Sequence, residues 1–237
     1  MQQDNNTNIN HFFNAAFSVD LVLFTFHEGE IKIALEKKEE VRFEGQPGLP
    51  GMLIYPNEDT GSALESLSAM VVGHSDYYRN QLRAFTAVAR HPQGRVITIG
   101  YYGLIPFEKV QLVNDKITWN NIESLPNLCY DHNGIIPVAL EKFKNEVIHQ
   151  PVIFELLPEH FILREIIEAY ELLFKKNFDA ANFRRQLRSS GLIAPVGKIR
   201  DTEHQIGRKP EEYRFDKALY QAQKQKEKIG FTFTANS

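Results

Sequence analysis

The stretch GMLIYPNEDTGSALESLSAMVVG, residues 51–73, combines the signals for a short strand, a loop and a helix. Residues 57–60 include Asn, Asp and Thr, whose side chains cap helix N-termini. Gly73 suits the left-handed conformation with which many helices end. The apolar residues of SALESLSAMVV lie between these signals and therefore predict a helix over residues 62–72.

Strand-like segments surround this helix. Apolar residues that alternate with period two predict extended segments over residues 16–26, 31–38, 77–90 and 95–106. The few tens of residues around Trp119 show little pattern, and residues 132–148 then place apolar side chains at helical spacing. The front half of the chain is thus predicted to mix strands with helices.

The pattern changes in the back half. Residues 161–174 have the periodicity of an amphipathic helix. Asp179 is a good N-cap for a second, arginine-rich helix over residues 180–190. Two strand-like segments, LIAPVGKIR and EEYRFD, follow and are joined by a basic loop. A helix, a short turn, a basic helix and a two-stranded ribbon predict a winged helix-turn-helix.

The composition is ordinary for a soluble globular protein. Of the 237 residues, 43% are hydrophobic and 24% are charged. No apolar run reaches the roughly 20 residues that span a bilayer, and MQQDNNTNINHFF lacks the order of a secretory signal. Cys129 is the only cysteine, so an intrachain disulfide is excluded. We expect a cytoplasmic protein with no membrane partner.

Charge is divided unevenly along the chain. Residues 1–149 carry 12 Lys and Arg against 18 Asp and Glu, whereas residues 150–237 carry 15 against 12. An acidic front half and a mildly basic back half suggest two domains with different partners, although a difference of this size also arises by chance.

Residues 51–73 also resemble the signature of the Nudix hydrolases. That signature is a glycine, five residues, a glutamate, seven residues and then R-E-U-x-E-E-x-G-U, where U is a bulky aliphatic residue. With Glu58 on the first glutamate, Met52 takes the position of the opening glycine and Gly73 that of the late glycine. The positions of the arginine and of the three metal-binding glutamates are held by Ser66, Leu67, Met70 and Val71.

Further segments extend the resemblance over roughly residues 12–216. They are HPQGRVITIGYYGLIP (91–106), the D-H, F-E-L-L-P and N-F-R-R elements within residues 125–193, and GRKPEEYRF (207–215), in which Lys209 is an insertion. In this order they are similar to the Nudix-related transcriptional regulators of bacteria, which have an N-terminal Nudix domain and a C-terminal winged helix.

The resemblance implies an α+β chain, in which a Nudix α/β/α sandwich with a mixed sheet is followed by a winged helix-turn-helix domain. The domains that we expect are a polar tail over residues 1–11, a Nudix-like effector-binding domain over 12–149, a winged helix DNA-binding domain over 150–216 and a C-terminal helix or tail over 217–237.

The chemistry of a Nudix hydrolase is missing from the sequence. Catalysis there needs several carboxylates on one helix to hold Mg²⁺ or Mn²⁺ against a diphosphate, and Leu67, Met70 and Val71 cannot ligate a hard cation. We therefore expect no catalytic residue, no metal site and no cofactor, in a domain that recognises a ligand without cleaving it. The alternatives are an active pyrophosphatase that uses Glu58 and Glu65, and a scaffold whose basic helix contacts an acidic protein.

Polar and basic side chains of the second helix and of the basic loop are candidates for contacts with double-stranded operator DNA. They are Asn182, Arg184, Arg185, Arg188, Lys198, Arg200, Arg208 and Lys209. A merely solvated helix face is the alternative interpretation. Because two half-sites require two modules, we expect a homodimer on a palindromic operator.

The resemblance also implies a small-molecule effector, either an ADP-ribose-like product of NAD metabolism or, in one branch, a pentose. Because the metal site is lost, we expect a repressor that responds to a pentose such as L-arabinose, with ADP-ribose sensing as the alternative. Candidate ligand contacts are Ser18, Asp20, Glu36, Lys38, Arg42, Glu44 and Tyr102. Structural roles are predicted for His74, His91, His149 and the pair Asp131–His132, which is expected to cap a helix.

Overall fold

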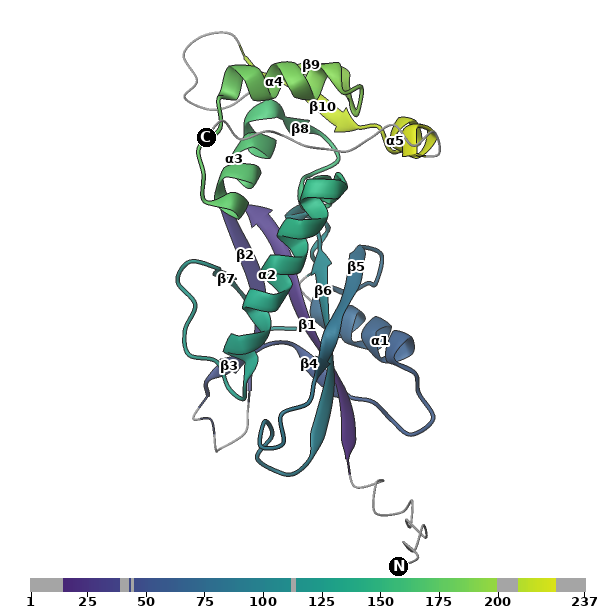
Figure 1. Ribbon diagram of the computed structural model, residues 1–237, viewed down its shortest axis with the longest axis vertical. Coiled ribbons are helices and arrows are strands. Elements are labelled where there is room, and N and C mark those ends of the chain that lie inside the picture. Colours follow the sequence, from purple (N-terminus) through teal and green to yellow (C-terminus); the bar gives the residue numbers. More distant parts are fainter. Residues whose placement is uncertain (1–14, 39–42, 44, 112–113, 200–208, 225–237) are drawn as a thin grey trace, which may run out of the picture.

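The computed structural model describes residues 15–38, 43, 45–111, 114–199 and 209–224 (Figure 1). Its front part is a seven-stranded mixed sheet. The strands are β1 (Ala16–His27), β2 (Glu30–Lys37), β3 (Pro47–Gly48), β4 (Gly51–Leu53), β5 (Tyr78–Phe85), β6 (Val96–Leu104) and β7 (Ile117–Asn121). The order is β3-β2-β1-β6-β5, with β4 paired to β1 and β7 paired to β2. The central pair, β1 and β6, is parallel, and the other pairs are antiparallel.

Two helices cover the two faces of this sheet, α1 (Thr60–Val72) and α2 (His132–His149). Successive side chains of a strand point to opposite faces, and β1 is buried on both. Val22 and Phe24 pack in a hydrophobic cluster with α2, whereas Leu21 and Leu23 pack in a second cluster with α1. This α/β/α sandwich confirms the predicted fold of the front domain.

The caps of α1 are those that its sequence predicts. The Asp59 carboxylate accepts a hydrogen bond from the Ser62 amide at 2.9 Å, and Gly73 ends the helix with a φ of 84°. Hydrogen bonds from the backbone amides of Ser62 and Gly61 hold the pKa of Asp59 below its ordinary value. The predicted helix over residues 62–72 is therefore confirmed, with two further residues at its start.

The back part is a winged helix built on a three-stranded sheet in the order β8-β10-β9. Its elements are a 3-10 helix, η4 (Val152–Leu156), β8 (Phe161–Ile162), α3 (Leu163–Phe174), α4 (Ala180–Ser189), β9 (Ile193–Ile199), β10 (Glu211–Phe215) and α5 (Lys217–Lys224). Asp179 caps α4 as predicted. Phe183 and Leu187 form the apolar face of α4 and are buried in the core. Every helix in the described ranges is too short or too polar to cross a bilayer.

The two parts share one hydrophobic core. A single cluster of buried residues runs from Phe24 in β1 and Phe143 in α2 to Ile166 in α3 and Tyr213 in β10. Figure 1 shows α2 leading directly from the sheet towards the winged helix. An ion pair between Lys175, at the end of α3, and Glu123, after β7, adds a polar contact at 2.8 Å. The winged helix therefore packs directly against the front part and is not joined to it by a linker alone.

Three regions differ from the sequence-based expectation. The unpatterned region around Trp119 contains both the 3-10 helix η3 (Phe107–Lys109) and strand β7, whose partner β2 lies far away in the chain. Phe161 and Ile162 were expected to begin α3 but form β8, because Ile162 has extended backbone and pairs with β10. The arm predicted over residues 77–90 is regular only over β5.

Candidate functional site

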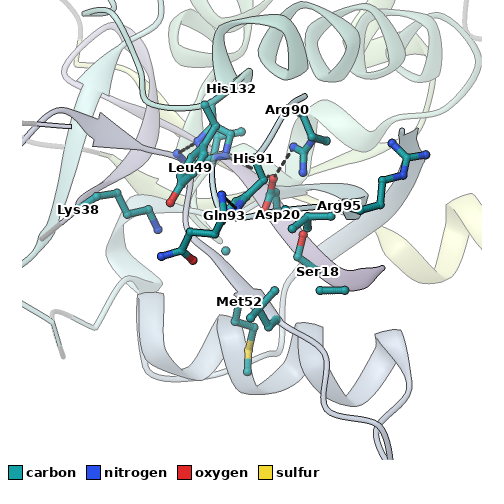
Figure 2. A pocket seen from close by; sticks show the side chains of 16 residues that line it. Ser18, Asp20, Lys38, Leu49, Met52, Arg90, His91, Gln93, Arg95 and His132 are labelled. Carbon is teal, nitrogen blue, oxygen red and sulfur yellow. Dashed lines mark hydrogen bonds and ion pairs between the residues drawn. The ribbon is translucent and has the colours of Figure 1, made fainter. Parts of the chain in front are cut away.

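A pocket of about 480 Å³ opens where β1 and β6 begin, next to β4 (Figure 2). Ser18 and Asp20 enter it from β1, whose even-numbered side chains point to this face. The segment that follows β5 contributes Arg90, His91, Gln93 and Arg95, and the start of α2 contributes Tyr130 and His132. The volume lies within the range of roughly 300–1,000 Å³ that is usual for small-molecule sites.

A buried arginine organises the inner end of the pocket. Arg90 is only 8% exposed, and its guanidinium forms a two-pronged contact with Asp131, with Nη2–Oδ1 and Nε–Oδ2 distances of 2.7 and 3.0 Å. The same Nη2 lies 3.4 Å from Oδ2 of Asp20, and Nη1 donates to the Thr98 hydroxyl. Thr98 in turn shares a 2.5 Å hydrogen bond with Ser18. Charge pairing of this kind is what allows ionised groups to be buried.

His132 also belongs to this network, and its contacts fix which ring nitrogen carries the proton. Its Nδ1 accepts a hydrogen bond from the Leu49 amide at 2.8 Å, so the ring proton resides on Nε2, which lies 3.4 Å from Oδ2 of Asp20. Two glycines make this close packing possible. A Cβ on Gly48 would lie 2.4 Å from the Cys129 sulfur, and a Cβ on Gly51 would lie 2.4 Å from Oδ1 of Asp20.

The rim of the pocket is cationic and aromatic. Lys38 forms an ion pair with Glu36, and Arg95 donates to the backbone carbonyl of Thr86 at 2.7 Å. The rings of His91 and Tyr130 stack with centroids 5.0 Å apart. Tyr130 has a φ of 55°, a left-handed backbone conformation that is uncommon for a residue other than glycine and is often found at functional sites.

The structure places the predicted ligand contacts unevenly. Ser18, Asp20 and Lys38 line the pocket, whereas Glu36 reaches it only through Lys38. The prediction for Tyr102 is wrong. Its strand position does face the same side of the sheet as Asp20, but α2 covers that side further along, so Tyr102 is fully buried and donates its hydroxyl to Glu146. Arg42 and Glu44 lie outside the described residues.

Several pocket residues were not predicted to be functional. Arg90 and Arg95 flank the HPQG turn before β6, and this placement beside a glycine and a proline was the signal available in the sequence. The sequence predicts structural roles for His91 and His132; both also line the pocket. Asp131 was predicted to cap α2, yet its carboxylate makes no capping hydrogen bond and is paired with Arg90 instead.

The three positions that hold metal in Nudix hydrolases carry apolar residues, and two of these residues belong to the core. Leu67 and Val71 are buried in the hydrophobic cluster between α1 and β1, and Met70 is 49% exposed. Glu58 accepts a hydrogen bond from the Tyr55 amide at 3.3 Å. Across the described part of the chain, no three His, Cys, Asp or Glu side chains come together in a way that could hold a metal ion.

The second candidate site is the outer face of α4. Arg184, Arg185 and Arg188 are exposed there, on the side opposite the buried Phe183 and Leu187. Arg185 donates to Oδ1 of Asn182 at 2.7 Å. These three arginines therefore present a cationic surface on the second helix of the helix-turn-helix.

The three arginines are not equivalent. The Arg188 guanidinium lies over the ring of Tyr213 at 5.8 Å and donates to the Tyr213 hydroxyl at 3.2 Å. Arg188 thus ties α4 to β10, whereas Arg184 and Arg185 are exposed and, among the residues that the structure describes, have no such anchor in another element. Lys209 is exposed before β10, and the side chain of Lys198, together with Arg200 and Arg208, lies outside the described part of the chain.

Comparison with known proteins identifies the back domain. Residues 153–215 match the family described as the NrtR DNA-binding winged helix domain. The ADPR responsive transcriptional repressor NtrR of Acinetobacter baylyi is 23% identical over 206 residues, which cover 84% of this chain and 81% of that repressor.

Solved structures extend the likeness to both domains. NrtR of Shewanella oneidensis in complex with a 27mer DNA is 26% identical, with a TM-score of 0.73, and the match covers 84% of this chain and 93% of that one. The Nudix domain of the same protein in complex with ADP ribose is 25% identical, with a TM-score of 0.50 and coverage of 58% and 94%. Residues 153–215 thus match the NrtR winged helix family, and the chain as a whole is similar to the NrtR regulators over most of its length, with a Nudix-like domain before the winged helix.

Proposed function

We propose that this protein is a transcriptional repressor that binds operator DNA through its winged helix and is controlled by ADP-ribose or a closely related nucleotide sugar. The effector would bind the pocket of the front domain, residues 12–149, and the operator would bind the winged helix, residues 150–216. The observation that carries this proposal is that the front domain has a polar pocket, while two of the metal positions of helix α1 are filled by the core residues Leu67 and Val71. Such a domain can still bind the nucleotide sugar, but it lacks the metal site that a Nudix hydrolase needs to cleave the diphosphate.

The pocket favours a nucleotide sugar over the pentose expected from the sequence. Lys38 and Arg95 offer cationic donors at the rim, which a neutral pentose would not need but a diphosphate would use. The volume of about 480 Å³ leaves room for a ligand larger than one sugar ring. The names of the Acinetobacter and Shewanella relatives, which refer to ADP-ribose, also support this choice.

The DNA-binding half of the proposal rests on α4. Arginines on the second helix of a winged helix-turn-helix are placed to meet base edges and phosphates of the major groove. Arg184 and Arg185 are exposed and free to do so, and the DNA-bound relative from Shewanella has the same domain order. We further propose a homodimer, because a two-fold operator matches two winged helices.

The proposal is tested by fluorescence anisotropy with DNA from upstream of the regulated genes. We expect specific binding that weakens steeply with salt and is reversed by ADP-ribose but not by L-arabinose. Changing Arg184 and Arg185 together to Ala should remove most of the binding, because the operator loses two cationic contacts. Calorimetric titration of the same variant with ADP-ribose should give the wild-type affinity.

A matched control is Arg164→Ala, which removes one exposed arginine from α3, where it pairs with Glu168. This variant should bind DNA nearly as the wild type does. Specific release by L-arabinose, or turnover of ADP-ribose at an ordinary enzymatic rate with Mg²⁺ or Mn²⁺, would overturn the proposed effector or the proposed lack of catalysis, respectively.

A further inference from the structure

The Asp20 carboxylate at the inner end of the pocket has hydrogen-bonding capacity to spare. Asp20 is 6% exposed, yet its two polar contacts, from Arg90 and His132, both reach Oδ2 and are both 3.4 Å long. Within the described residues, Oδ1 has no hydrogen-bond partner and lies against Gly51. A carboxylate can accept about four hydrogen bonds, and a buried one is costly unless they are made. The pocket therefore presents an under-used acceptor to whatever enters it.

The charge of this inner end is unfavourable for phosphate. Two carboxylates, Asp20 and Asp131, share the single guanidinium of Arg90. His132 is neutral in the tautomer set by Leu49, so it adds no positive charge. The excess is one negative charge, shared between the buried Asp20 and the partly exposed Asp131, and it favours neutral hydroxyl donors over anions.

The rim has the opposite character. Lys38 is balanced by Glu36, but the described contact of Arg95 is to a neutral carbonyl, so the charge of Arg95 remains available. Figure 2 shows Lys38 and Arg95 on opposite sides of Asp20. A ligand with a sugar at one end and a diphosphate in its middle would fit this gradient only with the sugar inwards.

We propose that Asp20 is the specificity-determining residue of the pocket and accepts two hydrogen bonds from vicinal hydroxyl groups of the ligand's terminal sugar, while Arg95 meets its phosphates. This inference rests on the proposed function, since it assumes a nucleotide-sugar effector. It adds two points to that function. The terminal sugar lies at the inner end of the pocket, and its hydroxyl groups are what Asp20 recognises. A terminal ribose, with its cis-diol, offers two donors at the spacing of one carboxylate.

The test compares ADP-ribose with an analogue whose terminal sugar is 2-deoxyribose, by calorimetric titration. Wild-type protein should bind the analogue about tenfold more weakly or worse, because a hydrogen bond to a charged group is lost. The variant Asp20→Asn should bind ADP-ribose about tenfold more weakly or worse and should discriminate little between the two ligands, because its amide cannot accept both hydroxyls. Melting curves of the variant establish that it is folded.

Asp76→Asn is the matched control. It removes a carboxylate from an exposed position of the same domain that does not line the pocket. The discrimination between the two ligands should persist in this variant. Equal binding of both ligands by the wild type, a comparison that needs no variant, would overturn the role of Asp20 and leave the proposed function standing. Failure of ADP-ribose to bind at all would overturn both.

Discussion

At the scale of single residues, the front domain differs from a hydrolase at a few side chains. Leu67 and Val71 point from α1 into the hydrophobic cluster with β1, where a carboxylate would be surrounded by apolar atoms. The domain has therefore lost more than its metal ligands, because apolar side chains fill the space in which two of the carboxylates would lie. Restoring one glutamate would place a charge in the core without rebuilding a metal site.

We expect Leu67→Glu to lower the free energy of unfolding by about 3 kcal/mol or more, since it combines a lost core side chain with a buried charge. It should not produce hydrolysis of ADP-ribose. Thermal unfolding and a phosphate-release assay with Mg²⁺ measure the two outcomes. Met70→Glu is the control, because Met70 is 49% exposed and its replacement should cost less than about 1 kcal/mol. Robust turnover by the Leu67 variant would contradict our account of the domain.

At the scale of elements, helix α2 is fastened at both ends. At its start, Asp131 is paired with Arg90 of the pocket. In its last turns, Glu146 accepts hydrogen bonds from the hydroxyls of Tyr78 and Tyr102 and, at 2.7 Å, from the amide of Asn80. Burial, assisted by hydrogen bonding to Glu146, raises the pKa of Tyr78 to about 12 and raises that of Tyr102 as well.

This contact makes stability depend on pH in alkaline solution. Unfolded tyrosine has a pKa of about 10, so the folded state holds the Tyr78 proton more tightly than the unfolded chain does. The contribution is complete below pH 10 and is lost as the pH rises from about 10 to about 12. Melting temperatures should fall across this window, and Tyr78→Phe should reduce the slope. The exposed Tyr55, changed to Phe, serves as the control; equal slopes in all three proteins would rule out the assigned role.

The sequence reveals elements whose signals are local. Asp59 and Gly73 predict both ends of α1, and Asp179 predicts the start of α4, because a cap and its helix are neighbours in the chain. Strand β7 escapes prediction because its five residues are held in place by β2, whose position the sequence alone does not reveal.

The sequence does not predict the arrangement of the pocket, for the same reason. Arg90 contacts Asp131 and Asp20, which are 41 and 70 residues away in the sequence. No local sequence pattern predicts contacts between residues so far apart. Asp20, by contrast, could be selected from the sequence and does line the pocket, because a charged residue inside an apolar strand stands out.

At the scale of the whole molecule, the shared core joins ligand recognition to the winged helix. Phe143 of α2 and Ile166 of α3 belong to one buried cluster, and both are fully enclosed. An effector that favours one placement of α2 therefore acts on a structure that includes α3. Coupling between two sites requires that the ligand have different affinities for two arrangements, and this packing offers a route for it.

We expect the two domains to unfold together. Calorimetry should give one transition, and ADP-ribose at about 100 times its Kd should add about 2.7 kcal/mol to the free energy of unfolding and shift the transition as a whole. Two separate peaks, of which the ligand moves only the first, would show that the common core does not couple the domains. L-arabinose at the same concentration is the control and should leave the melting curve unchanged.

The only cysteine of the chain, Cys129, is 1% exposed behind the pocket wall. A thiol-reactive dye should therefore find no accessible target on the native protein, and a cysteine added at an exposed point of α4 would be labelled selectively. In the proposed homodimer, energy transfer between labels attached there would report the distance between the two α4 helices in solution, with and without operator.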